Sequence, residues 1–192
     1  HSDSANFRQW LSIPEEKMNS AWWNSAINST KRDRNEVAIM KSLSKNLARK
    51  CGVENRALTT HVDSRGSLYE LYRETWSPSS KFAQWNVVRS EPNVIRGVHV
   101  HPNNCDYLHV LQGSLLLGIH DLRPDNPADR ATGFIELTGD VPRSVYIPNG
   151  VCHGFYFQSP TTYLYGLSTG WSMDEELGCK YNDPELGLDW PL

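Results

Sequence analysis

The chain has 192 residues, 39% of them hydrophobic and 21% charged, so we expect one packed domain, or one domain with an appendage. The formal net charge is −3 without a basic stripe, which excludes a general nucleic-acid-binding protein. No apolar run approaches the ~18–20 residues that span a bilayer, so we expect no membrane partner. The four cysteines form no C-x-x-C pair and follow no signal segment, which predicts reduced thiols and a cytoplasmic protein.

Residues 1–55 are expected to form a helical extension. Between residues 13 and 53, apolar side chains recur at three- and four-residue steps, the spacing of one helical face. Pro14 suits a first helical turn, and Gly52 suits the position just after a helix end. A polar segment over residues 29–35 could interrupt the helix.

Residues 56–192 are expected to form a mainly β domain, because the hydrophobic period falls toward two. Apolar runs occur at residues 85–88, 107–122, 144–157 and 163–167. Gly113 predicts a hairpin turn within the second run, and residues 148–150 break the third. Short strands separated by Gly, Pro and Asn predict an all-β sandwich or barrel.

Five of the seven histidines lie between residues 99 and 153. A lone strand histidine is usually structural, but several can converge on one cavity of a barrel. His99 and His101 share a strand face, Asp106 follows them, and His153 ends the segment that begins at Pro148. These residues resemble the two cupin motifs, H-x-H-x(3,4)-E-x(6)-G and P-x-G-x-x-H, with Asp106 at the usual Glu position. In metal cupins these four positions bind one divalent ion, and the donors suit iron, manganese, nickel or zinc.

A second resemblance covers most of residues 56–192. IRGVH at residues 95–99 resembles the L-R-G-L-H signature of the dTDP-4-dehydrorhamnose 3,5-epimerase family. Further matches in the same order are DSRGSLYE at 63–70, QWN at 84–86, IPNGVCHGF at 147–155 and the YNDPELGLDWPL ending at 181–192. The resemblance implies a cupin-type double-stranded β-helix, or jelly-roll barrel, so the two resemblances agree on the fold.

The family resemblance implies an isomerase that epimerises a dTDP-4-keto-6-deoxysugar, or a related nucleotide keto sugar, in deoxysugar and polysaccharide biosynthesis. The ketone acidifies the C3 and C5 protons, and their removal requires a base, a carboxylate that orients it and an acid on the other ring face. By resemblance, His99 is the base, Asp183 its orienting partner and Tyr165 the acid. This interpretation involves a homodimer and no cofactor, and it leaves open epimerisation at C3, C5 or both.

The same resemblance implies a site for the nucleotide-linked sugar. Arg65 and Arg96 match arginines that bind the diphosphate, for which a planar guanidinium is well suited. The positions matched to other contacts with the substrate are Glu70, Gln84, Asn86, His153 and Trp171.

One departure from the family keeps other functions open. The family carries a lysine shortly after the base, thought to stabilise the enolate oxygen, but Asp106 stands at that position and His101 replaces the usual glutamine. Both changes favour a metal, which could replace the lysine as a Lewis acid. The alternatives are a non-catalytic sugar-binding cupin and a metal-dependent cupin enzyme, an oxygenase or small-molecule isomerase. The latter would bind one divalent metal through His99, His101, Asp106 and His153.

Overall fold

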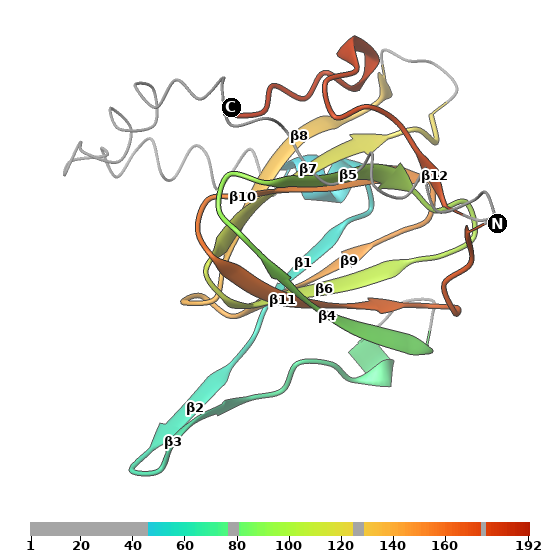
Figure 1. The fold of residues 1–192 in the computed structure, drawn as a ribbon. Helices are drawn as coiled ribbons and strands as arrows, with labels where there is room; N and C mark the ends of the chain where they lie inside the picture. Colours follow the sequence, from blue (N-terminus) through green and yellow to red (C-terminus); the bar gives the residue numbers. More distant parts are fainter. Residues whose placement is uncertain (1–45, 77–80, 125–128, 174–175) are drawn as a thin grey trace, which may run out of the picture.

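The computed structural model describes residues 46–76, 81–124, 129–173 and 176–192 (Figure 1). Residues 46–50 are helical, and the chain leaves this helix at Gly52, whose φ of +62° is the left-handed value expected after a helix end. The rest of the expected helical extension lies outside the described residues. No helix among the described residues has the length and apolar character that a membrane crossing requires.

Two five-stranded antiparallel sheets form the barrel (Figure 1). The first has the order β1-β9-β6-β11-β4 and comprises Glu54–Ala57, Arg143–Ile147, Asp106–Gln112, Thr161–Leu167 and Gln84–Ser90. The second has the order β12-β5-β10-β7-β8 and comprises Leu177–Gly178, Ile95–Val100, Val151–Phe157, Ser114–Asp121 and Thr132–Thr138. From β4 onward the chain passes back and forth between the sheets, which confirms the mainly β, jelly-roll prediction.

Two predicted turns are confirmed. Gly113 joins β6 to β7 at a φ of +83°, and a Cβ there would lie 2.2 Å from the carbonyl oxygen of Pro160, so only glycine fits. Residues 148–150 separate β9 from β10.

A separate hairpin, which we call the arm, projects from the barrel (Figure 1). It consists of β2 (Thr60–Asp63) and β3 (Gly66–Tyr69), and nearly all its residues are exposed. Strands exposed on both faces carry no alternating apolar pattern, which is why the sequence gives no sign of them. A short 3₁₀ helix, Glu74–Trp76, follows the arm, and another, Pro184–Leu186, lies near the C-terminus.

The apolar core lies between the two sheets and grades into a polar region. Every second residue of β10 faces inward, namely His153, Phe155 and Phe157. Phe155 and Phe157 belong to the apolar core, so the polar His153 lies at its border on the same strand. The segment before β1 adds Ala48 and Cys51 to this core. The boundary expected between residues 55 and 56 falls inside strand β1, Glu54–Ala57. Other fully buried members are Leu108, Val145, Leu115, Leu117, Ile119 and Ile135.

Candidate active site

A bulge between β5 and β10 sets the direction of His99. His99 lies opposite His153 and Gly97 lies opposite Gly154, so one step on β10 corresponds to two on β5 and Val98 is the extra residue. Gly97 has a φ of +91°, and a Cβ there would lie 3.0 Å from both Gly154 Cα and the His153 carbonyl oxygen. Glycine therefore allows the close approach that puts the His99 ring beside His153.

Three imidazoles meet at this point. The ring centroid of His99 lies 4.2 Å from that of His153 and 4.9 Å from that of His101, and the His101 and His153 centroids are 5.7 Å apart. His101 and His153 are buried, whereas His99 is half-buried. The prediction that His99 and His101 share a face is confirmed.

Asp106 reaches the histidines from the opposite sheet. It begins β6, and its Oδ2 lies 3.7 Å from Nε2 of both His101 and His153. The described residues give the Asp106 carboxyl no Lys or Arg partner. We refer to His99, His101, His153 and Asp106 as the histidine cluster.

Burial sets the protonation of the histidine cluster. Desolvation, together with the neighbouring imidazoles, lowers the pKa of His99 well below 6.5 and that of His153 to about 3. Both rings are therefore neutral at neutral pH. Burial, with the negative charge of Glu176, raises the pKa of Asp106 well above 3.8.

The tautomer of His153 follows from one hydrogen bond. Its Nδ1 lies 3.1 Å from the Val151 carbonyl oxygen, and a carbonyl can only accept. Nδ1 therefore carries the proton, and Nε2 of the neutral ring keeps its lone pair on the side of Asp106.

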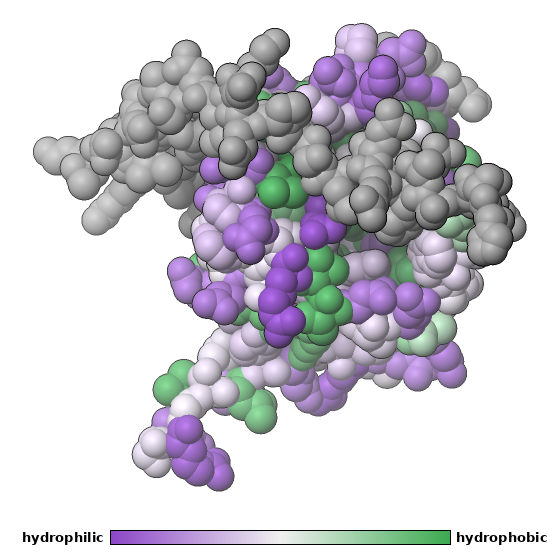
Figure 2. All heavy atoms as spheres, viewed as in Figure 1, coloured by the Kyte–Doolittle hydropathy of each residue, from purple (hydrophilic) through white to green (hydrophobic). Residues whose placement is uncertain are grey.

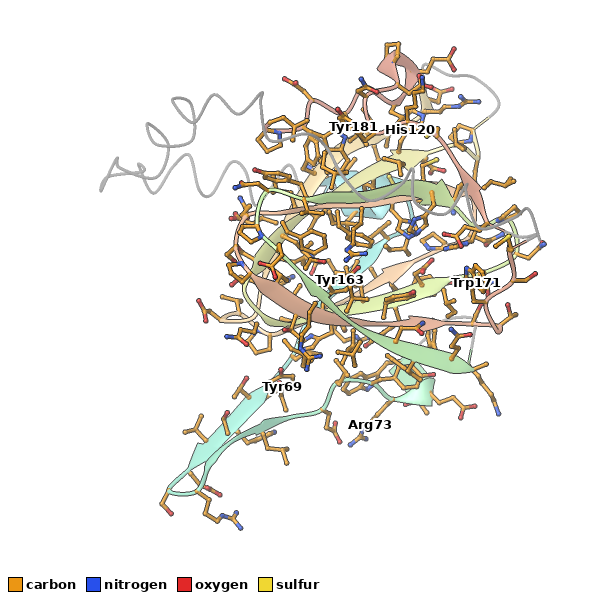
Figure 3. The ribbon with its side chains drawn as sticks, in the orientation of Figure 1. Tyr69, Arg73, His120, Tyr163, Trp171 and Tyr181 are labelled. Atoms are coloured by element: carbon orange, nitrogen blue, oxygen red, sulfur yellow. The ribbon has the colours of Figure 1, made fainter. Side chains whose placement is uncertain are left out.

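Tyr165 faces the barrel interior from the first sheet. It lies two residues from Tyr163, and the two stacked rings have centroids 6.3 Å apart (Figure 3 shows Tyr163 between the sheets). Burial raises the pKa of Tyr165, and the charges of Asp106 and Glu176 add to this while Arg96 opposes it. The phenol is therefore protonated at neutral pH and can donate a proton.

Polar side chains line the end of β4 nearest to Trp171. Asn86 lies opposite Tyr165 in the sheet, and its Oδ1 accepts a hydrogen bond of 3.2 Å from Gln84 Nε2. Gln84 Oε1 accepts a bond of 2.8 Å from the Trp171 backbone N–H. Asn86 Nδ2 is buried and makes no hydrogen bond within the described structure, so it is a donor available to a ligand. The Trp171 ring is 46% exposed at the edge of the barrel, and its indole donates to Glu176 (Figure 3).

Arg96 lies close to the two tyrosines of β11. Its Nε donates a hydrogen bond of 2.8 Å to Ser90 Oγ. Burial raises the pKa values of Tyr163 and Tyr165, and the positive charge of Arg96 offsets part of that rise. Arg96 is therefore near enough to Tyr165 for its charge to act on the phenol.

Arg65 and Glu70 are not brought to the histidine cluster within one chain. Arg65 lies in the turn of the arm, where its side chain is 87% exposed and pairs with Asp63. Glu70 follows the arm and pairs with Arg73 on the outer surface.

Asp183 has a backbone partner of its own. Its carboxylate accepts a hydrogen bond of 3.0 Å from the Glu185 backbone N–H, which caps the last 3₁₀ helix. It lines a cleft of about 520 Å³ formed by the C-terminal segment. Within the described residues no hydrogen bond joins Asp183 to His99, so its orienting role stays a prediction.

Two residues of this region were not predicted as site residues. Phe155 lies between the histidines and the core, with its ring centroid 5.8 Å from that of His153, and its place in the H-G-F segment could have indicated this. The negative charge of Glu176 raises the pKa values of Asp106 and Tyr165. Glu176 lies in a loop and the two residues it affects lie on strands, so no local sequence pattern could have indicated its role.

The donor set of the histidine cluster fits a divalent metal. The three histidines each offer a nitrogen, and these nitrogens lie within 4.8 Å of one another. Imidazole suits Zn, Cu, Fe and Ni, and Asp106 offers a carboxylate oxygen beside two of the rings.

Comparisons with known proteins match this barrel. The family model described as dTDP-4-dehydrorhamnose 3,5-epimerase matches residues 52–192. A dTDP-4-dehydrorhamnose 3,5-epimerase of Streptomyces griseus is 33% identical over 139 residues, which cover 68% of this chain and 69% of the relative. The spore coat polysaccharide biosynthesis protein SpsL of Bacillus subtilis is 29% identical over 143 residues, or 72% of this chain and 95% of the relative.

A solved structure agrees with these matches. The dTDP-4-dehydrorhamnose 3,5-epimerase of Bacillus anthracis, with TDP and PPi bound, superposes with a TM-score of 0.67 at 32% identity. The match covers 73% of this chain and 85% of that one.

Proposed function

The chain belongs to the dTDP-4-dehydrorhamnose 3,5-epimerase family, and we propose that it is an isomerase that epimerises a dTDP-4-keto-6-deoxysugar at C3, C5 or both. The observation that carries the proposal is the position of His99 on one sheet and Tyr165 on the facing sheet, both directed into the barrel. A sugar ring held between the sheets would have a base on one face and an acid on the other.

His99 is the proposed base. The 4-keto group makes the protons on C3 and C5 acidic, because their removal gives an enolate delocalised onto the ketone oxygen. The lowered pKa of His99 keeps the imidazole neutral, so it is ready to take a proton at neutral pH. By resemblance, Asp183 orients His99. The same C-terminal segment approaches His99, because Gly178 of β12 pairs with His99 of β5.

Tyr165 is the proposed acid. Its raised pKa keeps the phenolic proton at neutral pH, and return of that proton to the ring face opposite His99 inverts the carbon. The overall reaction transfers only protons, so the proposed epimerisation needs no cofactor.

The nucleotide and sugar are proposed to bind along β4, between Arg96 at its Ser90 end and Trp171 at its Gln84 end. Arg96 supplies a cation for the diphosphate, and Asn86 has a buried donor without a partner in the described part of the chain. The exposed Trp171 ring is available to stack on the base, and the Gln84 bond to its backbone fixes the segment that carries it. His153, beside His99, completes the proposed sugar site.

We further propose a homodimer in which the arm reaches a second copy. Figure 2 shows apolar side chains on the arm, and Val62 and Leu68 are 77% and 64% exposed. Apolar side chains in such a position favour a partner surface. A second copy would also give Arg65 and Glu70 the substrate-binding roles that the resemblance implies. Light scattering coupled to size exclusion should give twice the chain mass of 21.8 kDa, and a monomer would overturn the dimer.

The cellular setting is proposed on chemical grounds. The four cysteines are all unpaired, which supports a reducing, cytoplasmic compartment. Deoxysugar and polysaccharide biosynthesis would use the product, in line with the name of the relative SpsL.

The proposed function is tested by product analysis. The full chain is incubated with a panel of dTDP-4-keto-6-deoxysugars, and proton NMR coupling constants report inversion at C3 and C5. The proposal predicts inversion for at least one sugar of the panel. A folded protein that inverts none of them would overturn it.

A further inference from the structure

The histidine cluster holds more potential ligands than the proposed proton transfer uses. His99 alone is the base, yet His101 and His153 place nitrogen atoms within 4.8 Å of it, and Asp106 places an oxygen beside these two rings. We propose that the four residues form a binding site for one divalent transition-metal ion of the zinc class.

The positions of the ligand atoms support this site. One oxygen of Asp106 is equally distant, at 3.7 Å, from Nε2 of His101 and Nε2 of His153. One nitrogen of His99 also lies within 4.8 Å of a nitrogen of each of the other two rings. Three imidazoles, two of them beside a carboxylate, are a donor set that zinc, iron and nickel favour.

The surroundings hold these ligands in place. The β5 bulge at Gly97 directs His99, and β10 carries His153 opposite it. The Val151 carbonyl fixes the Nδ1 proton of His153, so Nε2 is available as a ligand, which is the usual second-sphere arrangement at metal sites. Asp106 comes from the other sheet, so the site joins both sheets of the barrel.

The Asp106 carboxyl also has room for a cationic partner. Asp106 is 5% exposed and has no Lys or Arg partner within the described chain. Buried carboxylates in proteins are normally paired or bound to a metal. His99 is less deeply buried than His101 and His153.

Metal binding has a consequence that rests on the proposed function. The His99 lone pair can accept a proton or bind a metal, but not both at once. Zinc should therefore inhibit epimerisation, and a chelator should restore it.

Binding is tested on the full chain without any substrate. Metal-stripped protein is titrated with zinc chloride by calorimetry, and bound zinc is counted after dialysis. We expect one zinc per chain, and at least ~100-fold weaker binding in His101→Asn and Asp106→Asn. His61→Asn, which changes an exposed histidine of the arm, is the matched control and should bind as the wild type does.

The result on the unaltered chain decides whether the site exists. Failure of the folded wild type to bind one zinc would overturn it, whatever the variants do. Equal affinity in wild type and in folded Asp106→Asn and His101→Asn, checked by circular dichroism, would also overturn it.

A second assay separates this proposal from the proposed function. Solvent deuterium exchange into a dTDP-4-keto-6-deoxysugar is measured with chelator and with one equivalent of zinc. Exchange that zinc abolishes supports both proposals. Exchange unaffected by bound zinc overturns the claim that the catalytic base His99 is also a zinc ligand. One bound zinc without exchange in either condition supports the metal site and contradicts the epimerase.

Discussion

Substitution of Gly97 by alanine tests how the β5 bulge positions His99. The native φ of +91° is unfavourable for alanine, which costs about 1–3 kcal/mol. The new Cβ would also lie 3.0 Å from two backbone atoms of β10, Gly154 Cα and His153 O, and such overpacking costs about 1–3 kcal/mol. The expected loss in the free energy of unfolding is therefore about 2–6 kcal/mol.

Two glycine-to-alanine controls separate the cost of the backbone conformation from the cost of overpacking. Stability is measured by urea unfolding followed by tryptophan fluorescence. Gly170→Ala has open space and no unfavourable φ, so it should change stability by less than about 0.5 kcal/mol. Gly187→Ala has a φ of +59° with only ordinary contacts, so we expect a loss of about 1–2 kcal/mol. Gly97→Ala should also lose epimerase activity under conditions where it stays folded. Wild-type stability and activity in Gly97→Ala would refute the account of the bulge.

Three further predictions concern the core, the thiols and the arm. Leu117→Ala removes a fully buried side chain and should cost about 2–5 kcal/mol in thermal or urea unfolding, whereas a loss below about 1 kcal/mol would contradict its place in the core. Burial raises the pKa of Cys51 to about 11 and of Cys152 to about 12, from 9.0. At about pH 9, iodoacetamide should therefore alkylate these thiols at least ~50-fold more slowly in the folded than in the urea-unfolded protein, and the folded rate should rise with pH; equal rates would show that they are not buried. Arg65→Ala should leave the thermal midpoint unchanged, because its ion pair is exposed, but should raise KM ~10-fold if the arm serves a second copy, and an unchanged KM would contradict that role.

Much of the barrel could be predicted because its signals are local. Alternating apolar residues and the turn at Gly113 depend on a few neighbours in sequence, and the structure confirms them. The spacing of His99 and His101, with the later His153, likewise indicated a shared face and cavity, and the three rings do meet.

Other features depend on contacts that local spacing does not contain. The pairing of β5 with β10 determines that Gly97 sits in a bulge, and only the crossing between sheets brings Asp106 to the histidines. A motif match located Arg65, but it could not indicate that the residue lies on an exposed arm away from the cluster of its own chain. Glu176 belongs to no motif, and its charge raises the pKa of Tyr165 from a loop that the sequence pattern does not place.

The central claim is that His99 removes a proton from a carbon beside the ketone of a nucleotide-linked sugar. Its most direct test is deuterium incorporation from D₂O at C3 and C5 of a dTDP-4-keto-6-deoxysugar, followed by NMR with chelator present. The account predicts exchange by the wild type and a rate at least ~100-fold lower in folded His99→Asn. Exchange by His99→Asn at the wild-type rate would contradict it.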